Sequence, residues 1–256
     1  NNTNFMDALQ TLQGHRSIRK YKSEPVSELI LKSILEAAIR GSNTGNMQVY
    51  SIVVTQDETI KNQLAPTHFN QKMVVEAPVL LTFCVDFNRF NKWCKFRKAN
   101  PGYDNIQSFT WATIDTIIAA QNAAIAAESF GLGICYLGTT TYNADKIIDI
   151  LKLPEGVVPI TTITMGYPDE SPLLTDRLPF EAVVHSEVYH DYSKEDIDRL
   201  YAEKEAMIST LQLIEENKTE NLAQIFTEKR YTKNDNLHFS KIWLKVLEKQ
   251  CFMNNE

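Results

Sequence analysis

The sequence is poor in the features that mark secreted, membrane-embedded and disulfide-stapled proteins. Only four of its 256 residues are cysteines, and they show no Cys-X-X-Cys pair or pairing rhythm, so we expect no disulfide framework. No apolar run approaches the ~20 residues that a membrane-spanning helix requires. The opening residues Asn1 to Asn4 lack the charged and apolar regions of a secretory signal. These absences favour a reducing, cytoplasmic setting.

A strong excess of positive charge is also missing. The chain has 26 basic and 32 acidic residues, which gives a formal net charge of −6. This balance argues against a general nucleic-acid or membrane-surface binder. The hydrophobic share of 43% is close to that of globular proteins, so the chain can bury a large core.

Several common catalytic and nucleotide-binding motifs are absent as well. Gly131 and Gly133 are followed by Tyr136 where a dinucleotide fingerprint requires a third glycine, and they follow a predicted helix instead of a strand. The sequence contains no Walker A motif and no nucleophile elbow. Its five histidines show no metal-ligand spacing with one another or with the cysteines. Hydrolytic and metal chemistry therefore have no visible residues to carry them.

Apolar periodicity predicts an α+β fold with a mixed sheet. Buried strands are predicted at 50–55, 79–85, 134–137 and 157–165, with the last interrupted early by Pro159. Helices are predicted at 5–13, 29–38, 57–64, 107–130 and 144–151. The middle of the long helix, 117–127, is so rich in Ala and Ile that we expect it to be enclosed on all sides. The segment 88–104 is polar and shows no interpretable pattern.

The character of the chain changes near residue 190. Ser193 and Asp196 have the spacing of a capping box, and helical stripes continue from there, with a polar link at 215–220, to about Phe252. We therefore expect two parts: residues 1–190 as the main domain, and residues 191–256 as a C-terminal helical extension that packs on the core or on a partner subunit.

The most informative segment of the sequence is basic. Residues 14–21 read Gly-His-Arg-Ser-Ile-Arg-Lys-Tyr, and they stand out against the acidic background. Guanidinium groups and a neighbouring hydroxyl are the donors that bind planar anionic groups such as phosphate. From these residues alone, a solvated basic turn is about as good an interpretation as an anion site.

Three further polar clusters add weight to the second interpretation. They are the loop Ser42–Gln48 between a helix and a strand, the strand end Tyr136–Thr139, and Arg177-Leu178-Pro179 after the turn at Gly166–Pro168. Each is weak by itself, and the simplest interpretation of the first is an ordinary loop. Together they form a pattern that depends on their order along the chain.

In this pattern the sequence resembles the nitroreductase family of flavin enzymes, in particular its oxygen-insensitive NADPH nitroreductase and NADPH–flavin oxidoreductase branch. The matching stretches are 14–21, 42–48 followed by 50–54, 71–72, 119–138, 152–159, 165–168 and 176–179. The resemblance covers essentially the whole chain, more loosely after Tyr189. It implies a central mixed, mostly antiparallel sheet flanked by helices, and a domain-entwined homodimer with FMN in clefts at the subunit interface.

The resemblance also implies roles for individual residues. His15, Arg16 and Ser17 would hold the FMN phosphate, joined by Arg177, and Arg19 would reach the pyrimidine edge of the flavin, where a cation stabilises the charge of reduction. The remaining predicted contacts are to the ribityl chain and the ring, from Asn43, Gln71, Tyr136, Gly138 and Thr139. No catalytic side chain is expected, because the flavin N5 carries the chemistry.

The activity implied is an NAD(P)H oxidoreductase that passes hydride through the flavin to nitroaromatics, quinones or free flavin in ping-pong turnover. The basic cluster Lys229, Arg230 and Lys233 is a candidate for binding the 2′-phosphate of NADPH, although a solvated charged loop is an equal interpretation.

Two positions depart from the family pattern. Thr175 stands where a lysine is usual, two residues before Arg177, and Thr139 stands where a second glycine is usual. These departures keep a second function open: a flavin-bound redox sensor or storage protein with little turnover. A third alternative, a related enzyme with a substrate-clamping lid, would need a lid such as residues 88–104.

Overall fold

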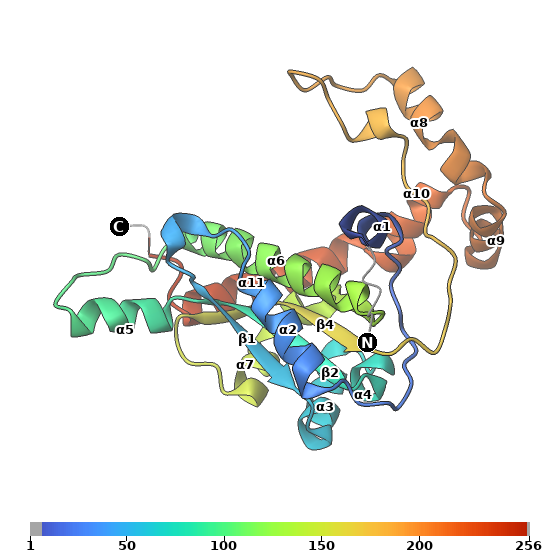
Figure 1. Cartoon of the computed structure of the whole chain (residues 1–256). Coiled ribbons are helices and arrows are strands. Elements are labelled where there is room, and N and C mark those ends of the chain that lie inside the picture. Colours follow the sequence, from blue (N-terminus) through green and yellow to red (C-terminus); the bar gives the residue numbers. More distant parts are fainter. Residues whose placement is uncertain (1–6, 255–256) are drawn as a thin grey trace. The chain divides into compact units, whose positions relative to one another are not determined.

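The computed structural model describes residues 7–254, and its centre is a four-stranded antiparallel sheet (Figure 1). The strand order is β1–β2–β4–β3, and every strand pair is antiparallel. The strands are β1 (Tyr50–Thr55), β2 (Val79–Asp86), β3 (Gly133–Leu137) and β4 (Val157–Gly166). The expected strands and the α+β class are therefore confirmed. The mixed character comes from one isolated parallel bridge, between Ser17 and Ile134.

The two central strands are buried on both faces, which explains why they appear in the sequence as nearly continuous apolar runs. The pairing between β2 and β4 shifts register between Phe83 and Cys84, so that Cys84 lies opposite Pro159. A proline cannot donate a ladder hydrogen bond and is tolerated in a sheet at such a bulge. The interruption predicted at Pro159 is thus a β-bulge.

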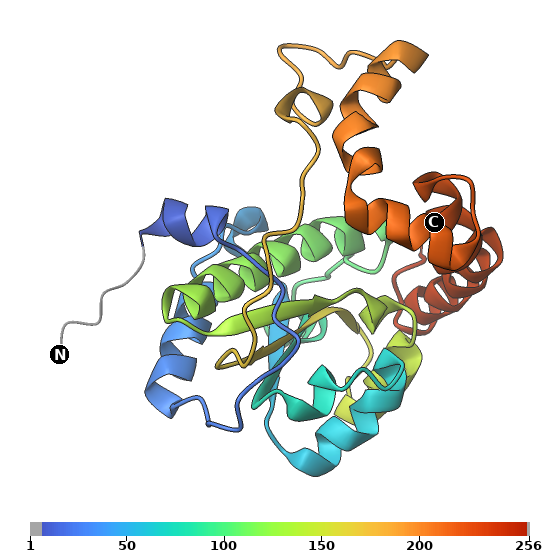
Figure 2. The same ribbon diagram turned by 90° about the vertical axis from the view of Figure 1, so that its right-hand side faces the viewer.

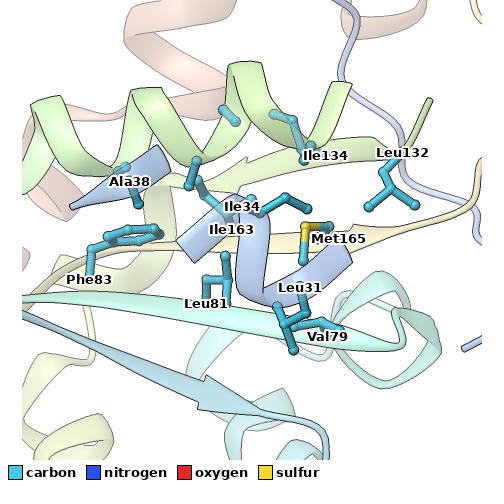
Figure 3. Close-up of a cluster of buried hydrophobic side chains, with 14 of the residues drawn as sticks. Leu31, Ile34, Ala38, Val79, Leu81, Phe83, Leu132, Ile134, Ile163 and Met165 are labelled. Carbon is cyan, nitrogen blue, oxygen red and sulfur yellow. The ribbon is translucent and has the colours of Figure 1, made fainter. Parts of the chain in front are cut away.

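Helices cover both faces of the sheet. Helix α6 (Ile106–Ser129) and helix α2 (Glu28–Ala38) lie along one face, where their side chains pack on those of the strands (Figures 1 and 3). Helices α3 (Glu58–Leu64), α4 (Met73–Glu76) and α7 (Ala144–Leu151) supply the apolar cluster on the other face. Side chains alternate accordingly along β2, with Leu81 in the first cluster and Leu80 in the second.

Alanines allow α6 to lie close to the sheet. Its buried positions include Ala120, Ala123 and Ala127, whose small side chains let the helix backbone approach the strands. The expectation that 117–127 is enclosed on all sides is wrong for the single chain. The side chain of Ile117 is 41% exposed, and Ile114 one turn earlier is 56% exposed, so one face of α6 is open to solvent.

Two smaller differences concern helix positions. Residues 88–104, for which the sequence shows no interpretable pattern, begin with helix α5 (Asn88–Phe96). The first described helix is α1 (Ala8–Gln13); the predicted start at residue 5 lies outside the described residues. Among the helices of residues 7–254, none combines the length and apolar character needed to cross a membrane.

The described chain divides into two compact units. The first contains residues up to Leu173 and again from Phe239 onward, and the second is Leu174–His238. The helices of the second unit are α8 (Lys194–Ala206), α9 (Ile208–Asn217) and α10 (Leu222–Gln224), followed by a π-helical turn at Ile225–Arg230; they are drawn in orange in Figure 2. Ser193 and Asp196 form the predicted capping box at the start of α8. Helix α11 (Lys233–Lys249) begins in the second unit and ends in the first.

Candidate functional site

The basic segment 14–21 lies against the edge of the sheet formed by β3. Ser17 forms a parallel bridge with Ile134, and the Ile18 N–H donates to the Ile134 carbonyl at 2.9 Å. Tyr21 forms an antiparallel bridge with Pro168, just beyond β4. The segment is therefore held in extended form at both ends, which excludes the interpretation of a freely solvated basic turn.

Close packing beneath the segment depends on two glycines. A Cβ atom at Gly133 would lie 2.5 Å from the Ile18 side chain, and a Cβ atom at Gly166 would lie 3.1 Å from the Tyr21 ring. The Tyr21 hydroxyl donates to the Ile18 carbonyl at 2.6 Å and is within 2.7 Å of Thr164 Oγ1. Burial of this ring raises the pKa of Tyr21, so it stays a neutral donor. The backbone of the segment is thus fixed before any ligand contact is considered.

Two acidic side chains partner the basic segment. His15 Nδ1 lies 2.6 Å from Glu128 Oε1, near the end of α6. Burial raises the pKa of Glu128, and its hydrogen bond with His15 opposes that rise. Glu170 accepts the backbone N–H groups of Arg19 at 2.5 Å and Lys20 at 3.2 Å. Neither acid was predicted from the sequence, because both are far from the segment along the chain.

The arginines of the segment keep most of their donors available. Arg16 donates one hydrogen bond, from Nη1 to the Pro172 carbonyl at 3.3 Å. It lines a cavity of about 320 Å³ together with Gly14, Glu128 and Gly133. Arg19 is exposed. A guanidinium carries five donors, so both arginines retain donors for an anionic ligand.

A second group of predicted residues meets around a buried histidine. His68 Nδ1 lies 2.8 Å from Thr139 Oγ1, and Gln71 Nε2 donates to the His68 carbonyl at 3.0 Å. Burial lowers the pKa of His68 to about 4, so the imidazole is neutral at pH 7. Its Nε2 atom is buried and has no hydrogen-bond partner among the described residues. His68 was not predicted as a site residue, because a lone histidine carries no motif in the sequence.

The end of β3 supplies the remaining predicted contacts of this region. The Tyr136 hydroxyl donates to Gln121 Oε1 on α6 at 3.2 Å, and burial raises the pKa of Tyr136. Gly138 follows directly after β3 and is exposed; a Cβ atom there would meet nothing within 4 Å. The chain therefore leaves open space at Gly138, beside the pair of Thr139 and His68.

Asn43 lies in a hydrogen-bonded loop and contacts other residues of that loop. Its Oδ1 atom accepts the Gln48 N–H at 3.1 Å. The buried Asp115 accepts the backbone N–H of Thr44 at 2.9 Å, and Gly45 has a φ of +57° that favours glycine. The hydrogen bonds of Asn43 with Gly41 and Gln48 thus hold the loop itself and do not join it to the basic segment.

The other predicted contacts lie in the second unit. Arg177 is exposed, and its Nη1 donates to the carbonyls of Thr175 and Asp176 at 3.2 and 2.9 Å. Lys229 and Arg230 end the π-helical turn, Lys233 begins α11, and all three are exposed. Their roles stay predictions.

Comparison with known proteins shows which family this chain resembles. Residues 12–167 match the Nitroreductase family. The oxygen-insensitive NADPH nitroreductase of Salmonella typhimurium is 35% identical over 181 residues, which cover 71% of this chain and 74% of that protein. The NADPH-flavin oxidoreductase of Vibrio harveyi is 34% identical over 75% of this chain and 78% of its own length.

Solved structures agree with the sequence comparison. A crystal structure from Bacteroides fragilis has a TM-score of 0.94 and 54% sequence identity, and the match covers 96% of this chain and all of that one. Residues 12–167, which match the family, include the basic segment and all four strands of the sheet. The chain therefore belongs to the nitroreductase family.

Proposed function

We propose that this protein is an FMN-dependent NAD(P)H oxidoreductase, which transfers electrons from a nicotinamide to nitroaromatics, quinones or free flavin. The observation that carries the proposal is the basic segment 14–21, fixed in extended form against β3 with its arginine donors largely free. Residues of this type hold phosphates, and the chain's family uses a flavin. We further propose that it works as a homodimer in the cytoplasm.

The residues present fit a bound flavin on two structural grounds. A Cβ atom at Gly138 would meet nothing within 4 Å, so the chain is open where the ring is proposed to lie against the end of β3. The unpaired Nε2 atom of the buried His68 is a polar atom close to this region. Nearly all buried polar atoms in proteins have a hydrogen-bond partner, and one without a protein partner is commonly paired with a ligand or water. Both features lie next to Thr139, one of the predicted ring contacts.

Each predicted residue then has a separate task. His15, Arg16 and Ser17 would hold the phosphate, with Arg177 as a fourth contact. Glu128 holds the His15 ring by the 2.6 Å hydrogen bond, so that the opposite ring nitrogen is presented in a fixed orientation. Asn43 and Gln71 would contact the ribityl chain or ring edge.

Contacts to the flavin ring are assigned to four residues. Arg19 would place a permanent positive charge at the pyrimidine edge, while Tyr136, Gly138 and Thr139 would line the ring. Bound flavin supplies reversible hydride acceptance, and the protein contributes binding, orientation and electrostatics. Because a cation near the ring favours the reduced, negatively charged form, Arg19 tunes the reaction without exchanging a proton.

The decisive experiment is a visible absorption spectrum of the purified protein, followed by anaerobic addition of NADPH and then NADH. We expect flavin absorption that bleaches on addition of NADPH, and release of FMN on denaturation, identified by mass spectrometry. A colourless protein that fails to take up added FMN would contradict the assignment. A yellow protein that neither nucleotide bleaches would favour the redox sensor instead.

A matched pair of variants tests the phosphate site. We expect Arg16→Gln to weaken FMN binding by 10-fold or more, since a charge-assisted hydrogen bond contributes about 1.5–3 kcal/mol. Riboflavin, which lacks the phosphate, should bind both proteins equally. Arg97→Gln removes an exposed guanidinium at the end of α5 and should leave FMN affinity unchanged.

A further inference from the structure

Three aromatic side chains of the first unit, none of them among the proposed flavin contacts, pack against one another. The rings of Tyr142 and Phe239 are stacked, with centroids 4.2 Å apart and an interplanar angle of 9°. Phe69 lies 6.3 Å from Tyr142 and 6.2 Å from Phe239, with its plane steeply inclined to both. The nearly equal distances place Phe69 beside the stack instead of on top of it. We call these three residues the ring cluster.

The ring cluster lies next to residues that we propose as flavin contacts. Tyr142 follows the 3₁₀ turn Gly138–Thr141 and donates its backbone N–H to the Thr139 carbonyl at 3.1 Å. Residues three apart in such a turn lie on the same side, so the side chains of Tyr142 and Thr139 share one side. Phe69 directly follows His68, whose ring lies 2.8 Å from the Thr139 hydroxyl. The ring cluster therefore flanks the proposed position of the flavin ring.

The backbone of Phe69 adopts a conformation that is unusual for phenylalanine. Its φ of +56° and ψ of 33° are left-handed, and Asn70 follows with a φ of +54°. Asparagine tolerates this conformation, whereas a bulky side chain is an outlier there. The Asn70 N–H donates to the Ala65 carbonyl at 2.8 Å, and Asn143 Nδ2 donates to the Thr67 carbonyl at 2.9 Å. Hydrogen bonds on both sides of Phe69 thus maintain its strained backbone.

Packing of the core does not account for a phenylalanine at position 69. Phe69 is 55% exposed, whereas Tyr142 and Phe239 are partly buried. A large apolar side chain that remains half in water stabilises the fold little, and its strained backbone costs free energy. Backbone outliers of this kind cluster at ligand sites. Strain and exposure therefore both indicate that the Phe69 ring serves binding.

The chain segments that carry the ring cluster are free of charged residues. Residues 65–71, 137–144 and 236–240 contain no Asp, Glu, Lys or Arg. They offer neutral hydrogen-bond donors instead, such as the exposed side-chain amide of Asn70 and the hydroxyl of Tyr142. Aromatic rings and neutral donors match a neutral, planar ring that carries acceptor oxygens. They provide no cation for a phosphate group.

We propose that Phe69 binds the electron acceptor and selects neutral, planar aromatic molecules, a class that includes nitroaromatics and quinones and excludes free FMN. The proposal rests on the proposed function, because the electrons come from the bound flavin. The acceptor's ring stacks on the exposed part of Phe69, while Tyr142 and Phe239 support Phe69 from the side. Nitro or carbonyl oxygens of the acceptor take the hydrogen bonds of the neutral donors.

Equilibrium binding to the oxidised protein tests this selection without turnover. Isothermal titration calorimetry, with no nicotinamide present, compares the neutral, planar 4-nitrobenzamide with cyclohexanecarboxamide, which has the same amide but no flat ring. We expect 4-nitrobenzamide to bind at least about 3-fold more tightly. Its affinity should be the same at low and high salt, because no ion pair forms. Equal binding of the two amides would overturn the proposal.

Variants at position 69 separate recognition from folding. Phe69→Asn removes the ring and introduces a residue that tolerates the left-handed conformation, so FMN content and melting temperature should stay near the wild-type values. Its affinity for 4-nitrobenzamide should fall about 3- to 10-fold, and KM should rise by the same factor with kcat unchanged. Phe69→Tyr keeps a ring and should bind like the wild type. Phe96→Asn removes an exposed phenylalanine on α5 and is the matched control.

Ferricyanide distinguishes failure of this proposal from failure of the proposed function. It is an acceptor without an aromatic ring, so Phe69→Asn should reduce it as fast as the wild type does. A protein that holds no flavin would overturn both proposals. A flavin-containing Phe69→Asn variant that binds and reduces 4-nitrobenzamide like the wild type would overturn the role of Phe69 alone. An equal loss of rate with ferricyanide would place Phe69 in the flavin site and likewise overturn its role in selection.

Discussion

His68 shows how one residue can combine a structural and a site role. Its ring is fully buried, bonds to Thr139 through one nitrogen, and leaves the other unpaired within the described chain. Because the ring is neutral at pH 7, Thr139 is held without placing a charge beside the proposed flavin site. A glycine at 139, usual in the family, would leave His68 without this partner. The threonine that replaces the usual glycine at position 139 is thus hydrogen-bonded by His68 of the same chain.

The buried His68 makes stability depend on pH in a defined direction. The unfolded histidine takes up a proton near its ordinary pKa of 6.5, whereas the folded one does so only near 4. The unfolded state therefore binds more protons between these values, and stability falls as the pH drops through this window. The contribution of His68 to the free energy of unfolding is complete above pH 6.5 and amounts to ~3 kcal/mol at most.

Denaturant unfolding at a series of pH values measures this effect. Between about pH 7 and pH 4, His68→Gln should lose less free energy of unfolding than the wild type, by up to ~3 kcal/mol. His190→Gln removes an exposed imidazole and serves as the control, with the wild-type profile expected. Parallel curves for wild type and His68→Gln would show that the buried ring is not the titrating group.

At the scale of elements, the site depends on how the N-terminal segment meets β3. Strand β3 begins at a crowded glycine, Gly133, and is followed directly by an open one, Gly138. Gly133 admits Ile18 from the basic segment. Gly138 leaves space for a ligand. A substitution at Gly133 should therefore affect both folding and binding, and one at Gly138 should affect binding alone.

We expect Gly133→Ala to reduce the free energy of unfolding by about 1–3 kcal/mol, because the new methyl group overlaps Ile18. It should also weaken FMN binding by displacing residues 14–21. Gly138→Ala should unfold like the wild type and still bind FMN more weakly. Gly102→Ala, where a Cβ atom likewise meets nothing within 4 Å, is the control for both measurements. Equal FMN affinity for Gly138→Ala and Gly102→Ala would remove Gly138 from the site.

The elements were more predictable from sequence than the contacts between them. Strand and helix periods are local, so β2, α6 and the capping box at Ser193 follow directly from the residues. The pair of His15 and Glu128 joins positions 113 residues apart, and no local pattern encodes it. Likewise, the sequence does not indicate whether an apolar side chain such as Ile117 is covered by its own chain or by another.

At the scale of the whole molecule, exposed apolar side chains are the main feature left unexplained by the single chain. On α6, Ile114 and Ile117 are exposed although they lie one turn apart on a helix whose opposite side is the core. A contiguous apolar helix face of this kind marks an interaction surface. We propose that this face of α6 contacts a second copy of the chain in the homodimer.

Size-exclusion chromatography with light scattering tests the dimer. The double variant Ile114→Glu with Ile117→Glu should shift the protein from dimer to monomer, since each subunit would place two unpaired charges in the buried interface. If the flavin is bound between subunits, FMN should be lost in the same variant. Phe96→Glu replaces an exposed apolar side chain on α5 and should leave the dimer intact. A wild-type monomer that binds FMN would contradict the proposal.

The docking of residues 14–21 on β3 and beyond β4 also sets an order of events during synthesis. The partners of Ser17 and Tyr21 are Ile134 and Pro168, so the segment leaves the ribosome long before its place in the fold exists. Closing so long a loop is entropically costly and comes late in folding. The segment that we propose to hold the flavin phosphate is therefore placed near the end of folding, and we expect a cofactor to bind a nearly finished protein instead of guiding its assembly.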